Sequence, residues 1–147
     1  MDEYQKAENA GRKKFKDAFG EYYTIDFTDK QYDRVDFYMT ANTPSKQTYV
    51  GEIKNYEDRP YAKYVDYAID YDKVKNITSI AAAEDRIPVL AVFFSDVDVV
   101  WNLNDVDFES TKEWMNVNKD GQHYGKEREN SLMTHLKIDD ARWTRKK

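Results

Sequence analysis

Two stretches between residues 32 and 54 alternate polar and apolar side chains, as half-buried β-strands do. In the first, Tyr32–Thr40, every second side chain is apolar, and Asp36 lies on the polar side. The second, Thr48–Lys54, places Glu52 and Lys54 two residues apart and therefore on one face of a strand. A polar segment that contains a proline separates the two stretches and predicts a turn. We therefore expect neighbouring strands that bring Asp36, Glu52 and Lys54 together.

Two segments have apolar residues at helical spacing. Residues 2–19 form the first, in which Glu8 borders the apolar stripe and either points inward or lies on a solvated helix edge. Residues 61–83 form the second, with Pro60 suited to a helix entry. Lys73 falls on the apolar stripe of this second helix. Its side chain either extends to solvent, which is the commoner outcome, or reaches a buried anionic site.

Further strands are predicted at residues 22–27 and at residues 86–95, where a continuous apolar run is typical of a strand buried on both faces. Residues 97–103 follow as a hairpin partner. From residue 104 onward the pattern fades, with residues 133–138 as a last edge strand. The order of the elements predicts an α/β fold of the mixed α+β kind, in which helices flank a central mixed β-sheet.

The length of 147 residues fits one domain, with a core over about residues 2–103 and a C-terminal extension over 104–147. The hydrophobic share of 40% and the aromatic share of 15% predict a folded chain. The absence of cysteine excludes disulfides, thiolate zinc sites and thiol nucleophiles. A polar N-terminus and short apolar runs predict no signal peptide and no membrane partner. We therefore expect a cytoplasmic protein, in the host cytoplasm if a phage encodes it.

The formal net charge of −5 argues against a dedicated, tight nucleic-acid binder. Basic residues nevertheless cluster at positions 12–16 and in the aromatic, basic tail Lys126–Lys147. Such clusters are most often solvated surface. The tail is our candidate for a dimer contact or for an arm that faces DNA.

Asp36, Glu52 and Lys54 place two carboxylates beside an ammonium group, an arrangement that suits a cation site and phosphate chemistry. The alternative is an exposed strand face with a cross-strand ion pair, worth less than about 1 kcal/mol. His123 and His135 lie in weakly patterned sequence, and we expect surface positions for both.

The element order helix, three strands, helix, buried strand, together with this motif, resembles the PD-(D/E)XK nuclease superfamily. The motif is Val35-Asp36, fifteen intervening residues, then Glu52-Ile53-Lys54. Val35 stands where the family has a proline, at a position that does no chemistry. The resemblance covers about residues 2–103 and implies a restriction-endonuclease-like αβββαβ core.

The resemblance implies that Asp36 and Glu52 bind a divalent metal, Mg²⁺ or Mn²⁺, with the main-chain carbonyl of Ile53 as a further ligand. Some branches of the superfamily add a glutamate from the first helix, and Glu8 is the matching candidate. The implied ligands are oxygen atoms, which both metals prefer.

The resemblance also implies that Lys54 positions or activates the attacking water and stabilises charge on the phosphate. Lys73 matches the lysine, glutamine or tyrosine that other branches place near the site from the second helix. The implied function is a metal-dependent nuclease, a hydrolase of phosphodiester bonds in DNA, in phage DNA processing, repair or recombination. A nuclease of this size that cuts both strands needs two active sites, which suggests a homodimer.

Two other functions remain open. One is a nuclease-like domain without catalysis, which serves as a nucleic-acid binder or an assembly module. The acidic net charge favours it, and the intact set of Asp36, Glu52 and Lys54 counts against it. The other is a protein-interaction module whose binding surface is the tyrosine-rich sheet, since the chain has 12 tyrosines.

Overall fold

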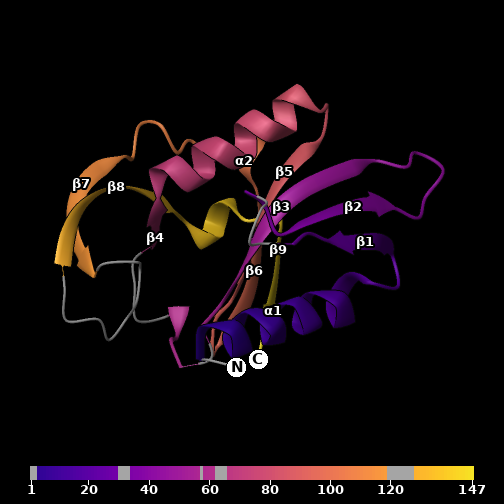
Figure 1. Ribbon diagram of the computed structural model, residues 1–147, viewed down its shortest axis with the longest axis horizontal. Coiled ribbons are helices and arrows are strands. Elements are labelled where there is room, and N and C mark those ends of the chain that lie inside the picture. Colours follow the sequence, from indigo (N-terminus) through magenta and orange to yellow (C-terminus); the bar gives the residue numbers. More distant parts are fainter. Residues whose placement is uncertain (1–2, 30–33, 57, 62–65, 119–127) are drawn as a thin grey trace.

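The computed structural model describes residues 3–29, 34–56, 58–61, 66–118 and 128–147. Within these ranges the chain adopts an α+β fold with two α-helices, a mixed six-stranded sheet and a three-stranded antiparallel sheet (Figure 1). No helix in the described ranges is long and apolar enough to cross a membrane.

The six-stranded sheet has the strand order β1-β2-β3-β5-β6-β9. Only the central pair, β3 and β5, is parallel in this sheet, and the register places Glu52 opposite Leu90. The parallel pair needs a crossover connection, which the second helix and the strand before it supply. The strands are β1 (Tyr23–Phe27), β2 (Phe37–Ala41), β3 (Thr48–Asn55), β5 (Ile87–Phe93), β6 (Val97–Asn102) and β9 (Trp143–Lys146).

Helix α1 (Glu3–Phe19) packs on one face of this sheet, with Phe15 fully buried against Phe37 and Ile53. The helix comes close to β3 because Gly11 has no side chain. A Cβ atom at Gly11 would lie 3.1 Å from the Cβ of Asn55. The Asn55 side chain also donates a hydrogen bond to the carbonyl of Ala7. This close contact fixes α1 beside the C-terminal end of β3.

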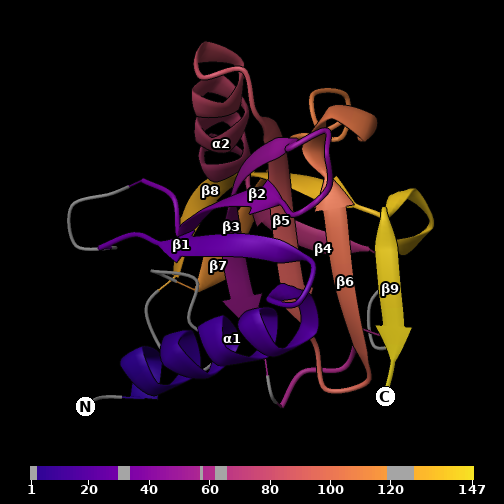
Figure 2. The ribbon, with the colours of Figure 1, turned by 90° about the vertical axis from the view of Figure 1, so that its right-hand side faces the viewer.

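Helix α2 (Tyr71–Ala83) covers the opposite face, as Figure 2 shows with α1 in front of the sheet and α2 behind it. Its side chains Val74, Ile77 and Ala81 are buried in a second core around Leu90 and Trp101. The two cores use alternate residues of the same strands, as the two-residue period of a strand requires. Each face of the sheet is therefore buried beneath one helix.

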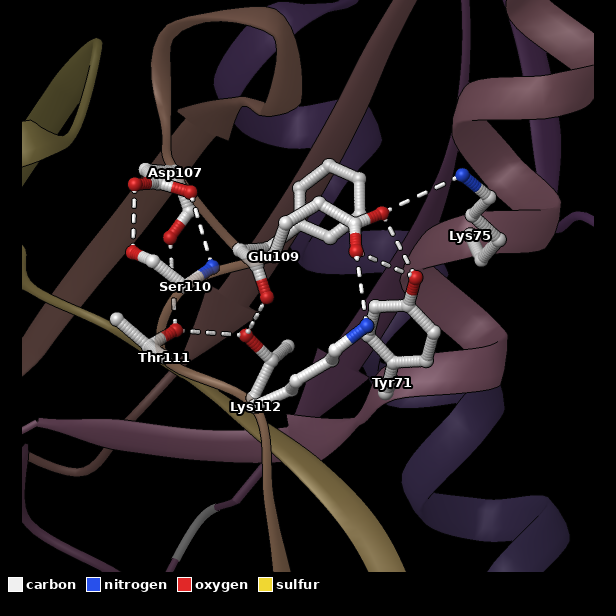
Figure 3. Close-up of polar contacts among 9 residues, drawn as sticks. Tyr71, Lys75, Asp107, Glu109, Ser110, Thr111 and Lys112 are labelled. Carbon is white, nitrogen blue, oxygen red and sulfur yellow. Dashed lines mark hydrogen bonds and ion pairs between the residues drawn. The ribbon is translucent and has the colours of Figure 1, made fainter.

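The three-stranded sheet has the order β4-β8-β7 and lies beside the N-terminal end of α2 (Figure 1). The loop that leads into it is held against α2 by Glu109, whose carboxylate accepts hydrogen bonds from Tyr71, Lys75 and Lys112 (Figure 3). The strands are β4 (Tyr67–Asp70), β7 (Glu113–Asn118) and β8 (Arg128–Leu136).

The prediction of one helix over residues 61–83 is wrong in its first part. Residues 67–70 form β4, which pairs with β8, and α2 begins only at Tyr71. The Asp70 side chain accepts a hydrogen bond from the N–H of Asp72 and so caps the helix. Pro60 therefore does not open the helix, and residues 62–65 lie outside the described ranges.

Two strand predictions also need correction. The strand expected over residues 32–40 begins at Phe37 and ends at Ala41, and residues 32–33 lie outside the described ranges. The edge strand expected at residues 133–138 is part of β8, which has neighbours on both sides. It is the central strand because β4 and β7, neither of which the sequence pattern indicated, pair with its two edges.

The C-terminal part of the chain completes the main sheet. Strand β9 pairs with β6, and the buried carboxylate of Asp98 receives Arg145 at 3.0 Å and Lys147 at 2.8 Å. Two of the basic residues that suggested a DNA-facing arm are thus partners of a buried acid. Residues 126 and 127 of that tail lie outside the described ranges.

Candidate active site

The site forms where the regular β2–β3 ladder ends, after the pair Phe37–Gly51. The next residue, Asp36, donates its backbone N–H to the carbonyl of Gly51 at 2.8 Å. Its carboxylate Oδ2 accepts a hydrogen bond of 2.8 Å from the backbone N–H of Ile53. That N–H belongs to the peptide group that joins Glu52 to Ile53. The side chain of Asp36, which is 1% exposed, is therefore fixed beside Glu52.

Glu52 is completely buried on the face of β3 that α2 covers. Its Oε1 atom lies 3.1 Å from Nζ of Lys73 and 3.8 Å from Nζ of Lys54. Burying a carboxylate costs several kcal/mol unless charged partners compensate. Lys73 and Lys54 supply that compensation, and both keep part of their side chains in solvent, with exposures of 33% and 25%. The buried carboxylate is therefore joined to the surface through its two lysine partners.

A third cation, Arg12, reaches Asp36 from α1. Its Nη2 atom lies 3.7 Å from Oδ1 of Asp36 and donates a hydrogen bond of 3.0 Å to the carbonyl of Thr28. The guanidinium also stacks over the ring of Phe27, 5.2 Å from its centre. Glu8, one helical turn earlier, lies 3.8 Å from the same Nη2 atom. Glu8 is thus linked to Asp36 through Arg12.

Tyr67 of β4 belongs to the surroundings of Glu52. Burial is the main cause that raises the pKa of its hydroxyl well above 10.0, the nearby Tyr56 adds to it, and the negative charge of Glu52 raises the pKa further. The hydroxyl groups of Tyr67 and Tyr56 are 2.8 Å apart. Tyr67 therefore remains a neutral phenol at physiological pH and adds no charge to the site.

Ile53 has a divided role. Its side chain packs in the core beneath α1, against Phe15 and Val89. Its main-chain groups point toward the neighbouring strands, and its N–H donates a hydrogen bond to the carboxylate of Asp36. Any contribution of Ile53 to ligand binding would come from its carbonyl oxygen, as the resemblance to the PD-(D/E)XK superfamily implied.

The donor set of the site fits a hard divalent cation. Asp36 and Glu52 supply buried carboxylates on either side of one peptide group. Within the described residues no group of three or more His, Cys, Asp or Glu side chains forms a metal site. A metal held here would take two carboxylates and complete its shell with main-chain oxygen and water. Mg²⁺ is commonly bound in this way, through one or two carboxylates with several retained waters.

Comparisons with known proteins identify no relative of this chain. No protein-family model matches the chain, and neither do curated proteins or solved structures. The function of the protein is therefore inferred from the geometry of the site.

The structure brings most of the predicted site residues into one region. Lys73 reaches the buried carboxylate of Glu52, which was the less common of its two expected outcomes. Glu8 is 19% exposed and lies 3.8 Å from the Arg12 guanidinium that also approaches Asp36, and its predicted role as a metal ligand stays a prediction.

One of the two histidines, His135, is in the described part of the chain and belongs to the three-stranded sheet. His135 is in β8, where its ring nitrogens bond to Asp66 at 2.8 Å and Glu113 at 2.9 Å. It links β7 to the residue before β4 with 17% of its side chain exposed, so the expectation of a surface position is met only in part. His123 lies outside the described ranges.

Sequence analysis missed Arg12 and Tyr67. Arg12 was grouped with a basic cluster, although it follows Glu8 by four residues and so lies on the same helix face. That spacing was the available signal. Tyr67 gave none, because it was assigned to a helix and its contact with Glu52 depends on β4.

Proposed function

We propose that this protein is a divalent-metal-dependent nuclease, a phosphodiester hydrolase with a restriction-endonuclease-like core of the PD-(D/E)XK type. One observation carries the proposal. The carboxylate of Asp36 is bonded to the peptide group next to the buried Glu52, and Lys54 of the same strand lies 3.8 Å from Glu52. Two fixed carboxylates with an adjacent ammonium are what metal-assisted attack on a phosphodiester requires.

The proposed roles follow from the charges. Asp36 and Glu52 would hold Mg²⁺ or Mn²⁺, with the Ile53 carbonyl as a further ligand. A bound metal of this kind lowers the pKa of water and neutralises phosphate oxygen charge. Lys54, one-quarter exposed, can donate hydrogen bonds to a phosphate oxygen or to the water that attacks it. Lys73 of α2 can hold the Glu52 carboxylate in place.

DNA is the proposed substrate because its phosphodiesters are anionic and the accessible cations at the site match that charge. Lys54 and Lys73 keep exposed portions while Glu52 and Asp36 are buried, so an approaching polyanion meets the ammonium groups first. This local arrangement offsets the acidic net charge of −5 at short range, because charges beyond about 8–10 Å are largely screened at physiological ionic strength.

One observation favours a second candidate, a nuclease-like module without catalysis. Each buried carboxylate already faces a cation of the protein, Arg12 for Asp36 and Lys73 for Glu52. Such pairs also occur as purely structural networks, which hold elements together without chemistry. A domain of this kind would use the same region to bind nucleic acid or another protein.

Cleavage assays separate the two candidates. Supercoiled plasmid and labelled single-stranded, duplex and branched DNA are incubated with the protein and with Mg²⁺ or Mn²⁺. We expect cleavage that chelation abolishes and that Asp36→Asn, Glu52→Gln and Lys54→Ala each lower by at least about a hundredfold. Absence of cleavage of every substrate by the folded wild-type protein would rule out the nuclease.

The control is Glu109→Gln. Glu109 also accepts hydrogen bonds from two lysines, at 3.3 and 3.2 Å, but it lies on the surface (Figure 3). This substitution makes the same change of charge outside the site, and we expect it to leave cleavage unchanged. An equal loss of cleavage in Glu109→Gln would indicate a general effect of charge or folding.

A further inference from the structure

A cavity of about 420 Å³ lies on the α1 face of the main sheet, away from the candidate active site. It is bordered by the first residues of β3 and β5, the end of β6 and the start of β9. The candidate site lies at the other end of β3, and its Glu52 is on the opposite face. The size is within the range of about 300–1,000 Å³ that is common for small-molecule sites.

Five of the twelve residues that line the cavity are aromatic. Phe19 contacts the ring of Trp143 with 5.0 Å between ring centres, and Tyr23 contacts Tyr49 at 5.6 Å with nearly perpendicular planes. Phe19 also connects these two ring pairs, because the centre of its ring lies 6.3 Å from that of Tyr23. These ring contacts are edge to face, and all four rings line the cavity. Walls of this kind favour a planar aromatic guest.

The polar side of the cavity carries one cation, Arg142, and two other polar residues, Asn102 and Asp105. Within the described residues the guanidinium of Arg142 has no ion pair or hydrogen bond, in contrast to Arg145 on the same strand segment, which is paired with Asp98. The side-chain oxygen of Asn102 accepts a hydrogen bond from the N–H of Asn104, which leaves the amide NH₂ of Asn102 as the group that can donate. Arg142 and Asn102 together offer donors to an anion.

We propose that this cavity binds a small aromatic carboxylate, with its ring between the aromatic walls and its carboxylate on Arg142. The guanidinium fork matches a carboxylate in a bidentate manner, and charge-assisted bonds of this kind are about twice as strong as neutral ones. Asp105 on the same rim disfavours a second negative group on the ligand and so selects a monoanion. This inference is independent of the nuclease proposal, because it uses none of the residues of that site.

The test is a calorimetric titration of the purified protein with 2-naphthoate and with its neutral analogue 2-naphthalenemethanol. We expect 2-naphthoate to bind at submillimolar concentration and the alcohol to bind at least about tenfold more weakly, since the alcohol cannot pair with a guanidinium. Arg142→Gln should lower the affinity for 2-naphthoate about tenfold and leave that for the alcohol unchanged. Val100→Phe, which fills the cavity from β6, should abolish binding of both compounds.

The matched control is Lys146→Gln, which removes one positive charge from β9, the strand that directly follows Arg142, at a residue outside the cavity lining. It should bind both compounds as the wild type does, and thermal melts establish that each variant is folded. The proposal is overturned if 2-naphthoate fails to bind at millimolar concentration or binds no better than the alcohol. An undiminished affinity of folded Arg142→Gln for 2-naphthoate, or binding of either compound by folded Val100→Phe, overturns it equally.

Discussion

The Nζ atom of Lys73 lies 3.1 Å from Oε1 of Glu52, so the second helix supplies a cation to a carboxylate that is completely buried on the central strand. This contact joins α2 to β3 across one face of the sheet. A buried acid that loses such a partner is left with a large part of its desolvation cost uncompensated. Lys73 is therefore expected to stabilise the fold as well as to position Glu52.

We predict that Lys73→Met lowers the free energy of unfolding by about 1–3 kcal/mol, less than for a fully buried pair, because Lys73 is partly exposed and Lys54 remains. Urea unfolding measures the change. The control is Lys75→Met on the same helix, whose ion pair with Glu109 is exposed (Figure 3) and which should change stability by less than about 0.5 kcal/mol. Equal effects of the two substitutions would contradict a special role for the Lys73–Glu52 contact.

Metal binding gives a second prediction, which separates the carboxylates from the lysine. Asp36→Asn and Glu52→Gln should each weaken Mn²⁺ binding at least about tenfold, because each removes an anionic oxygen ligand. Lys54→Ala should retain or strengthen binding, since the ammonium repels a cation. Isothermal titration calorimetry measures all three.

Glu109→Gln is again the matched control, and its Mn²⁺ affinity should equal that of the wild type. The interpretation fails if the three site variants and this control bind the metal alike. A purely structural ion-pair network makes a different forecast, in which the site substitutions lower stability and leave metal affinity unchanged.

Because α1 lies close to β3, we expect the addition of a single methyl group at Gly11 to destabilise the fold. Gly11→Ala would place a Cβ atom 3.1 Å from Cβ of Asn55 and 3.2 Å from Cγ2 of Ile53. The gain in helix propensity, about 1 kcal/mol, opposes an overpacking cost of about 1–3 kcal/mol. We expect Gly11→Ala to lower the free energy of unfolding by about 1 kcal/mol, which thermal melts measure. A Gly11→Ala protein that is more stable than the wild type would show that α1 can move away from β3 without cost.

The pH dependence of stability should report on His135. Burial lowers the pKa of its imidazole, but the hydrogen bonds that the ring donates to the carboxylates of Asp66 and Glu113 outweigh burial, and the net effect raises the pKa above 6.5. A raised pKa in the folded state means that His135 stabilises the fold fully below its unfolded pKa of about 6.5. This stabilisation is lost as the pH rises through the folded pKa.

The comparison is between the wild type and His135→Gln, with unfolding followed in urea at several pH values from about 6 to 9. The stability difference in favour of the wild type should be largest at the acidic end and should shrink as the pH rises. A difference that stays constant or grows with pH would contradict the assigned cause of the shift.

The sequence predicted the core of the fold because its pattern is local. Helix α1, strands β1, β3, β5 and β6, and the second half of the 61–83 segment all follow the hydrophobic period over many residues. The strand β4 is only four residues long and directly precedes α2, so its apolar residues merged with the helical pattern. Strands β7 and β9 were missed because polar residues make up half of β7 and most of β9, and because their pairing is non-local.

The residues of the candidate site were likewise predicted only in part from the sequence. Asp36, Glu52 and Lys54 were found because the spacing of two residues on a strand and the acid before the turn are visible in sequence. Arg12 was not found, since its contact with Asp36 joins α1 to the residue before β2, and a local hydrophobic pattern does not show such a contact. The protein's own cations beside each acid are therefore a result of tertiary packing.

The central claim is that Asp36 and Glu52 jointly hold a divalent cation, and crystals grown with Mn²⁺ test it most directly. We predict an anomalous difference peak in contact with carboxylate oxygens of both residues and absent from crystals of Glu52→Gln. Crystals that show no peak at this position, with Arg12 still beside Asp36 and Lys73 still beside Glu52, would contradict the claim.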